Sequence, residues 1–181
     1  YHHGDLRDSL VKAGLELIRH RTSDELSLRE VARSVGVSAT AVYRHFPDKQ
    51  ALLDALCVEG RAMLAKAQHD AMAAASGGQK GFDESGLAYV RFAVANPALF
   101  RLMIKSRPES PGSEDPIAGE ALQALKANVA VISPEGARPR QRQLRAIQAW
   151  SLVHGLTMLI LDGRLPHDEA MIEAVIRAPI T

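Results

Sequence analysis

The sequence predicts an all-α protein. Apolar residues recur at three- and four-residue spacing along most of the 181-residue chain, and no stretch alternates as a half-buried strand would. Cap-forming residues stand where helices should begin, and glycine or proline stands where they should end. Aromatic residues make up only 4% of the chain, which favours helices over a β-sandwich. With 46% hydrophobic residues, the chain is long enough to bury a core without disulfide or metal staples.

Capping and breaking signals set the order of the expected helices. Ser27 and Glu30 form a capping-box pattern, in which the Ser27 hydroxyl accepts from a first-turn N–H group and Glu30 reaches back. Ser38 and Asp48 can cap the next two helices, and Ser76-Gly77-Gly78 breaks the helical pattern. Helices are expected at about residues 6–20, 28–36, 39–46, 49–75, 87–94, 98–105, 116–132, 140–161 and 168–177, with loops at 106–115 and 133–139.

Residues 28–46 have the spacing of a helix-turn-helix. Ala32 is small where two helices must cross closely, and Gly36 permits the positive φ of a tight turn. An aliphatic residue, Val42, follows six residues after this glycine. The capping box and the preceding amphipathic helix strengthen the interpretation. The side chains expected to face the first helix are Val31, Val35, Val37 and Val42.

The second helix of this motif has two different faces. Val42 and Phe46 lie four residues apart and should face the core, whereas Thr40, Tyr43 and Arg44 share the opposite face. A short helix with an exposed polar face suits the major groove of DNA. Arg44 could form a bidentate pair with guanine, and Tyr43 could reach a phosphate with its hydroxyl or a thymine methyl with its ring.

Overall charge does not indicate nucleic-acid binding. The chain has 22 Lys and Arg against 21 Asp and Glu, a net charge of +1, so the motif alone predicts DNA binding. Lys49 and the N–H groups at the helix starts behind Ser27 and Asp48 are candidates for phosphate contacts. His45 either contacts phosphate or packs at the helix end.

Residues 27–53, SLREVARSVGVSATAVYRHFPDKQALL, resemble the DNA-binding domain of tetracycline-repressor (TetR) family regulators. The pair Tyr43-x-x-Phe46 followed by Asp48-Lys49 is highly characteristic. Residues 1–7, YHHGDLR, are similar to the opening of one TetR subgroup, and Trp150-x-x-x-His154-Gly155 resembles its tryptophan-histidine-glycine (WHG) C-terminal domain. Residues 89–103 fit the middle helices, so the resemblance covers nearly the whole chain.

The resemblance implies a three-helix DNA-binding domain, residues 1–47, joined to a larger helical effector-binding and dimerisation domain, residues 48–181. It implies a homodimeric regulator, most simply a repressor, that leaves a near-palindromic double-stranded operator when a small apolar or amphipathic effector binds. The apolar run at residues 152–161 places the dimer contact in the helices at about residues 140–161 and 168–177.

By the same resemblance, Tyr43 and Lys49 match phosphate-contacting positions, and Thr40 and Arg44 match base-reading ones. Many members carry glycine where Thr40 stands, so the role of that position cannot be carried over. The family's usual basic N-terminal arm is not part of the sequence. The candidate DNA-binding residues are Ser27, Thr40, Tyr43, Arg44, His45 and Lys49.

Aromatic, histidine and methionine side chains in the later helices are candidates for an effector site. At helical spacing the earlier ones suit a plain core equally well. His154 lies one turn from Trp150 and is either a buried structural histidine or a ligand-sensing one. Gly155 is expected to allow a close helix approach. The candidate effector-binding residues are Tyr89, Phe92, Phe100, Met103, Trp150, His154 and Met158.

Other function classes have little support. The single cysteine, Cys57, excludes an intrachain disulfide and is expected to be buried. No Cys/His cluster, phosphate loop or nucleophile motif is present, so no metal, cofactor or enzymatic activity is expected. Two alternatives stay open: a small-molecule or partner-binding protein with a vestigial helix-turn-helix, and a helical enzyme that uses His154. The longest apolar run, residues 149–161, is too short to span a membrane, which predicts a cytoplasmic protein.

Overall fold

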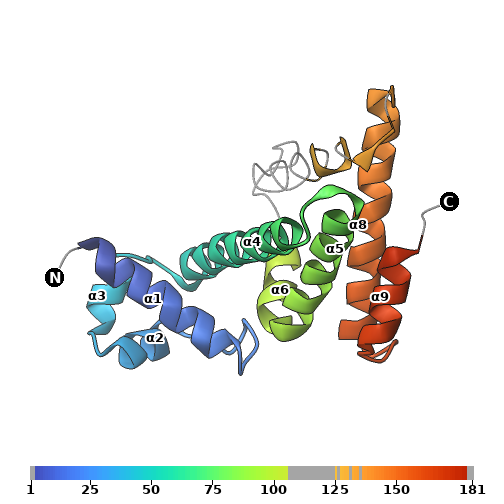
Figure 1. The fold of residues 1–181 in the computed structure, drawn as a ribbon. Coiled ribbons are helices and arrows are strands. Elements are labelled where there is room, and N and C mark those ends of the chain that lie inside the picture. Colours follow the sequence, from blue (N-terminus) through green and yellow to red (C-terminus); the bar gives the residue numbers. More distant parts are fainter. Residues whose placement is uncertain (1–2, 106–124, 126, 131, 135, 179–181) are drawn as a thin grey trace. The chain divides into compact units, whose positions relative to one another are not determined.

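The structure, a computed structural model, describes residues 3–105, 125, 127–130, 132–134 and 136–178, and this part of the chain contains helices and no strand (Figure 1). The all-α prediction is therefore confirmed. The expected loop at 106–115 lies outside the described residues, as does most of the helix expected at 116–132. The helices are α1 (His3–Ile18), α2 (Leu28–Val35), α3 (Ala39–Tyr43), α4 (Lys49–Ala74), α5 (Gly78–Ala95), α6 (Pro97–Lys105), α8 (Pro139–Leu161) and α9 (Glu169–Arg177).

Side-chain caps begin several of these helices where the sequence predicts them. The Ser27 hydroxyl accepts from the Glu30 N–H at 3.2 Å, and the Ser38 hydroxyl accepts from the N–H of Ala41 at 3.2 Å. Asp48 Oδ1 accepts from the N–H of Ala51 at 2.8 Å. Each cap satisfies an N–H group that the first helical turn leaves without a partner, which is why these boundaries could be predicted.

The second half of the predicted capping box is wrong. The Glu30 side chain does not return to Ser27 but forms an ion pair with the guanidinium of Arg21 in the preceding connection. A charged donor binds a carboxylate more strongly than a neutral N–H group does. α1 also differs from its expected span, because it starts at His3 and ends at Ile18.

The chain forms two compact units. The first contains Tyr1–Met63 and Asn96–Ser106, and the second contains Leu64–Ala95 and Arg107–Thr181. α6 therefore packs with the N-terminal helices rather than with the later ones, and α4 contributes residues to both units. These packing units do not follow the expected domains 1–47 and 48–181, whose boundary is a functional one and stays a prediction.

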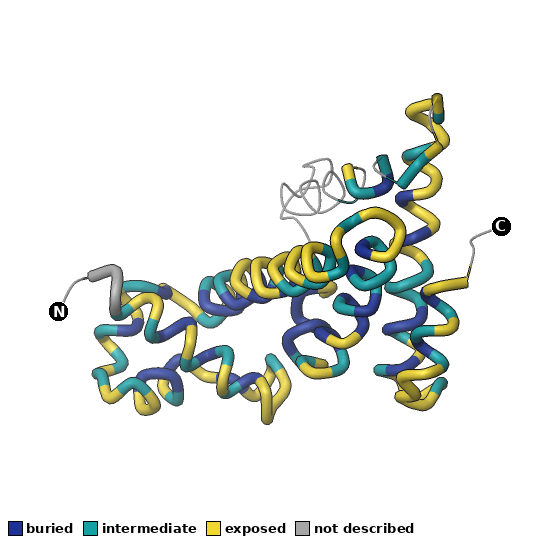
Figure 2. Tube along the Cα trace, viewed as in Figure 1, coloured by how far each residue is buried: buried dark blue, intermediate teal, exposed yellow. Residues whose placement is uncertain are grey.

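The first unit has its core between α1, α2, α3 and the start of α4, and buried and exposed positions alternate along these helices (Figure 2). α6 approaches α4 at Gly60, where an added Cβ would lie 2.8 Å from the Met103 sulfur and 3.1 Å from a Leu99 methyl carbon. The glycine lets the Met103 and Leu99 side chains of α6 lie directly against α4, and a side chain at this position would force them to move. Fully buried side chains of this core include Leu10, Ile18, Val31, Val42, Phe46, Leu52 and Leu56.

The second unit has a separate core between α5, α8 and α9. Ion pairs at its edge connect α5 to α9, with Arg91 bound to Glu169 and Glu173, and Arg177 bound to Glu84 at 2.8 Å. These pairs are partly exposed, so each contributes little energy, and the burial of apolar side chains holds the helices together. The buried cluster consists of Leu87, Val90, Leu156, Ile160, Ile172 and Ile176.

α8 carries apolar residues on two sides. Its 23 residues are long and apolar enough to cross a membrane by length and composition, which the expectation based on residues 149–161 missed. A core helix passes the same test, and one side of α8 packs in the second unit through residues such as Leu156 and Ile160. The other side leaves Leu144, Ile147 and Leu159 between 42% and 51% exposed.

The left-handed glycine in the turn between α2 and α3 should be important for stability. Gly36 has φ +76°, and an L side chain in this left-handed conformation costs about 1–2 kcal/mol. Gly36→Ala should therefore lower the free energy of unfolding by about that amount in chemical denaturation. Arg33→Ala, at an exposed position of α2 nearby, should change it by less than about 0.5 kcal/mol. Equal losses in both variants would contradict the role given to the turn.

Candidate nucleic-acid interface

The turn after α2 fixes where α3 lies. The N–H of Gly36 donates to the Arg33 carbonyl at 3.2 Å, and the N–H of Val37 donates to the Ala32 carbonyl at 3.0 Å. These bonds close α2 with a left-handed residue, as glycine-capped helices commonly do. Ala32 is 3% exposed, so α2 presents a small side chain where the helices cross. The left-handed glycine, its hydrogen bonds to the end of α2 and the small Ala32 side chain thus set the angle between α2 and α3.

α3 has one buried face and one exposed face. Val42 and Phe46 are 0% and 1% exposed, which anchors the helix in the core. Thr40, Tyr43 and Arg44 are all exposed, as their spacing predicts. Helical hydrogen bonds continue beyond the end of α3, because the N–H groups of residues 45 and 46 both donate to the Val42 carbonyl at 2.9 Å. Arg44 therefore projects from the same helical turn as Tyr43.

Lys49 has a partner that sequence reasoning missed. Its ammonium donates to the backbone carbonyl of Asp24 at 2.6 Å, and the side chain is half-buried. The bond ties the connection before α2 to the first residue of α4, 25 positions later. An ammonium group has three donors, so two remain for other acceptors. No periodicity connects these positions, which is why the contact could not be predicted.

The two remaining DNA-binding candidates, Ser27 and His45, are in different environments. The Ser27 hydroxyl is used as the cap of α2, and His45 is half-buried at the end of the α3 turn. Arg7 on α1 was not among the candidates, yet its guanidinium lies 5.2 Å from the centroid of the Phe46 ring. This cation–π contact attaches Arg7 of α1 to the end of the helix-turn-helix.

A polar pair lies within the second unit. The Tyr89 hydroxyl is 3.0 Å from His154 Nδ1, and their rings meet edge to face with centroids 6.5 Å apart. Burial raises the pKa of Tyr89 to about 12, and a hydrogen bond with the Trp150 side chain partly offsets this rise. Burial lowers the pKa of His154. A protonated phenol beside a neutral imidazole is the pairing in which Tyr89 donates and Nδ1 accepts.

The seven effector candidates do not share one unit. Tyr89 and Phe92 are buried in the second unit, which also contains the α8 residues Trp150, His154 and Met158. The other two candidates lie on α6 in the first unit, and both are buried. The α6 candidates are Phe100 and Met103. The structure thus brings Tyr89, His154 and Trp150 together in the second unit, whereas the α6 candidates belong to the first.

Among the described residues, no other helix makes the close approach expected at Gly155, and an approach by a second subunit at this position stays a prediction. An added Cβ there would have no heavy atom within 4 Å among the described residues. α5 and α9 pack against the opposite face of α8, where Leu156 and Ile160 are buried. Cys57 is buried, as expected, at 1% exposure. In the described part of the chain, no group of three or more His, Cys, Asp or Glu residues could hold a metal ion.

Two protein-family descriptions match the sequence. Residues 10–56 match bacterial regulatory proteins of the tetR family, and residues 82–180 match the tetracyclin repressor-like C-terminal domain. The second match covers more than half of the chain. The chain therefore belongs to the TetR family, and with its helix-turn-helix it is a DNA-binding transcriptional regulator. That the family is one of regulatory proteins speaks against an enzymatic role.

Solved structures have the same fold. A protein of unknown function from Rhodococcus sp. RHA1 is 31% identical, with a TM-score of 0.78 over 97% of this chain and 92% of that chain. A tetR-family transcriptional regulator from Streptomyces coelicolor is 22% identical, with a TM-score of 0.69 over 97% and 79%. A TetR variant from Acinetobacter baumannii AYE in complex with minocycline is 21% identical, with a TM-score of 0.60 over 93% of each chain.

The lowered pKa of His154 predicts a pH dependence of stability. Its folded-state pKa lies below the unfolded value of about 6.5, so the unfolded chain binds more protons between these two values. The free energy of unfolding should rise with pH through this window and fall as the pH drops below about 6.5. His154→Gln should flatten this dependence in thermal melts between about pH 5 and pH 7.

His69→Gln is the matched control, because His69 is exposed on α4. It should keep the wild-type slope of melting temperature against pH. A wild-type slope in His154→Gln as well would show that protonation of His154 is not coupled to folding.

Proposed function

We propose that this regulator is a repressor that binds a near-palindromic operator as a homodimer and is released by a small apolar or amphipathic effector. The observation that carries the proposal is the two-sided α3, whose exposed face holds Thr40, Tyr43 and Arg44. Burial of Val42 and Phe46 holds this face in a fixed orientation, and a rigid helix reads base edges better than a mobile one.

In this proposal, some residues hold the protein on the DNA backbone and others recognise the bases. Arg44 and Thr40 face base edges, whereas Tyr43 contacts a phosphate. Lys49 uses one donor for the Asp24 carbonyl and offers the others to phosphate. Ser27 acts through the start of α2, whose N–H groups can face the DNA backbone. His45 lies at the edge of the same surface.

The exposed side of α8 supports a homodimer contact through α8, whereas the contribution of α9 to this contact rests on the sequence alone. Leu144 and Ile147 are 51% and 44% exposed, and Ser151 and Gly155 follow at helical spacing. Small residues allow the backbones of two helices to approach closely, and the empty space at Gly155 leaves room for such a partner. Two copies would place their α3 helices in major grooves about 34–36 Å apart, which explains a near-palindromic operator.

The effector site is proposed in the second unit, around Tyr89, Trp150 and His154. Their hydrogen bonds fix polar groups beside the buried ring of Tyr89, and ligand sites contain a small number of such placed polar groups. The Trp150, His154 and Gly155 positions also support membership of the WHG subgroup. The effector would act by binding the conformation that does not bind DNA more tightly than the DNA-binding conformation. The difference between these two affinities, and not either affinity alone, determines the shift. A cytoplasmic location and the functional boundary at residue 47 are part of this proposal.

Sequence reading can be tested by enrichment of binding sites from a random duplex library at one fixed, near-physiological salt concentration. The wild type should enrich a near-palindromic motif. Arg44→Ala should blur it by removing about 1–3 kcal/mol of discrimination per contacted base pair. Lys49→Ala is the comparison variant and should weaken binding to all sequences alike, because phosphate contacts carry no base information.

If the wild type enriched no motif but still bound a small molecule, the alternative of a binding protein with a vestigial helix-turn-helix would replace this proposal. Unchanged motifs in Arg44→Ala would remove Arg44 from the base-reading residues and leave the regulator itself intact.

Light scattering at micromolar concentration tests the dimer. The wild type should have twice the 19.6 kDa mass of the chain. The double variant Leu144→Glu and Ile147→Glu should be monomeric, because four carboxylates cannot be buried together at a two-fold interface without a large desolvation cost. Val58→Glu, at a 53% exposed position on α4, is the matched control and should remain dimeric. A dimeric double variant would place the interface elsewhere.

A further inference from the structure

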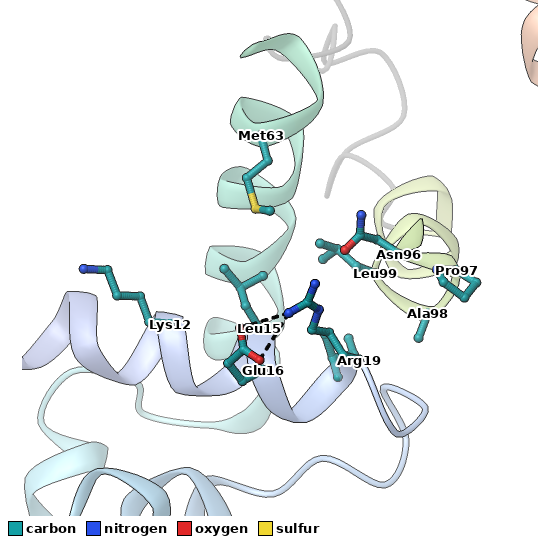
Figure 3. A pocket seen from close by; sticks show the side chains of 10 residues that line it. Lys12, Leu15, Glu16, Arg19, Met63, Asn96, Pro97, Ala98 and Leu99 are labelled. Atoms are coloured by element: carbon teal, nitrogen blue, oxygen red, sulfur yellow. Dashed lines mark hydrogen bonds and ion pairs between the residues drawn. The ribbon is translucent and has the colours of Figure 1, made fainter. Parts of the chain in front are cut away.

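A cavity of about 320 Å³ lies within the first unit, at the junction of α1, α4 and α6 (Figure 3). All of its lining residues belong to this unit, and none is among the seven effector candidates. Its volume is at the lower end of the range of about 300–1,000 Å³ found for small-molecule sites. The cavity is therefore distinct from the proposed effector site around Tyr89 and His154.

One side of the cavity is apolar. Leu15 from α1, Met63 from α4, and Ala98 and Leu99 from α6 line it. Leu99 is 4% exposed and lies against Gly60, where an added Cβ would be 3.1 Å from its side chain. This close packing holds the α6 wall firmly against α4. The apolar wall suits a short hydrocarbon group.

The polar groups of the cavity are arranged around Arg19. Its guanidinium extends from α1 toward the wall that carries Asn96 and Leu99, whereas the Lys12 side chain points away (Figure 3). Arg19 binds the Glu16 carboxylate through one nitrogen, with Nη1 3.4 Å from each of the two carboxylate oxygens, and the two side chains are 55% and 70% exposed. Such an exposed pair within one helix is weak, so a better-placed carboxylate can compete with it.

We infer that this cavity is a binding site for a small amphipathic carboxylate. The ligand carboxylate accepts hydrogen bonds from the planar guanidinium of Arg19, and its hydrocarbon part lies against Leu15, Met63 and Leu99. The charged residues of the lining are Lys12, Glu16 and Arg19, and because the Lys12 side chain points away, the positive charge that a ligand meets is that of Arg19. This charge selects an anionic amphiphile over a cationic one of the same size.

A ligand bound at this site would influence the orientation of the DNA-binding helix α3 through α1. α1 packs against both α2 and α6. A ligand that contacts α1 and α6 together stabilises the arrangement of these helices that fits it best, and α2 carries the turn that orients α3. This consequence rests on the proposed function, whereas ligand binding itself does not.

The site can be tested by isothermal titration of the full chain with octanoate, and with octylamine as the cationic counterpart. Octanoate should bind once per chain and octylamine should not. Arg19→Gln should weaken octanoate binding about tenfold or more, which is what losing a charged hydrogen bond predicts. Arg164→Gln, at an exposed position after α8 in the second unit, is the matched control and should bind octanoate as the wild type does.

A second variant, Ala98→Trp, fills the cavity without changing its charge and should abolish octanoate binding while the circular dichroism spectrum stays native. Octanoate binding that survives both Arg19→Gln and Ala98→Trp would overturn the inference, as would equal binding of octylamine. Because these titrations contain no DNA, they separate failure of this site from failure of the proposed regulator, which the duplex-library experiment decides.

Discussion

The helix-turn-helix depends on the burial of Val42 and Phe46 beneath α3. α3 has only five residues, and a helix this short is not stable by itself. Its position comes instead from two fully buried side chains, each contributing about 1.5–3 kcal/mol. The left-handed Gly36 directs the chain so that both reach the core. The polar face of Tyr43 and Arg44 exists only because the opposite face is held in this way.

Two polar contacts add to the apolar core in holding the helix-turn-helix in place. Lys49 ties the connection before α2 to α4, and Arg7 lies over the Phe46 ring from the start of α1. Both are cationic groups at the DNA-binding end of the chain that already have structural partners. Such partners restrict the side chains before DNA arrives, which reduces the entropy lost on binding. In the proposed function, Lys49 therefore serves both stability and phosphate binding.

In the second unit, α8 likewise has two faces with different surroundings. One side of α8 is buried against α5 and α9, and the other exposes Leu144, Ile147 and Leu159. Between them, the Tyr89–His154 pair is a polar contact that burial keeps uncharged. α8 thus joins three surfaces: a core, the proposed effector site and the proposed dimer contact. A ligand that shifts α8 would affect all of them.

Features that depend on neighbouring residues could be predicted from the amino-acid sequence alone: the caps of Ser27, Ser38 and Asp48, the turn at Gly36, and the two faces of α3. These rest on hydrogen bonds three or four residues apart and on helical spacing, so they can be read from the order of residues. Four other features required the three-dimensional structure: the pairing of Glu30 with Arg21, the bond from Lys49 to Asp24, the packing of α6 with the N-terminal helices, and the open space at Gly155. Each of these depends on which segments distant in sequence meet, and periodicity carries no information about that.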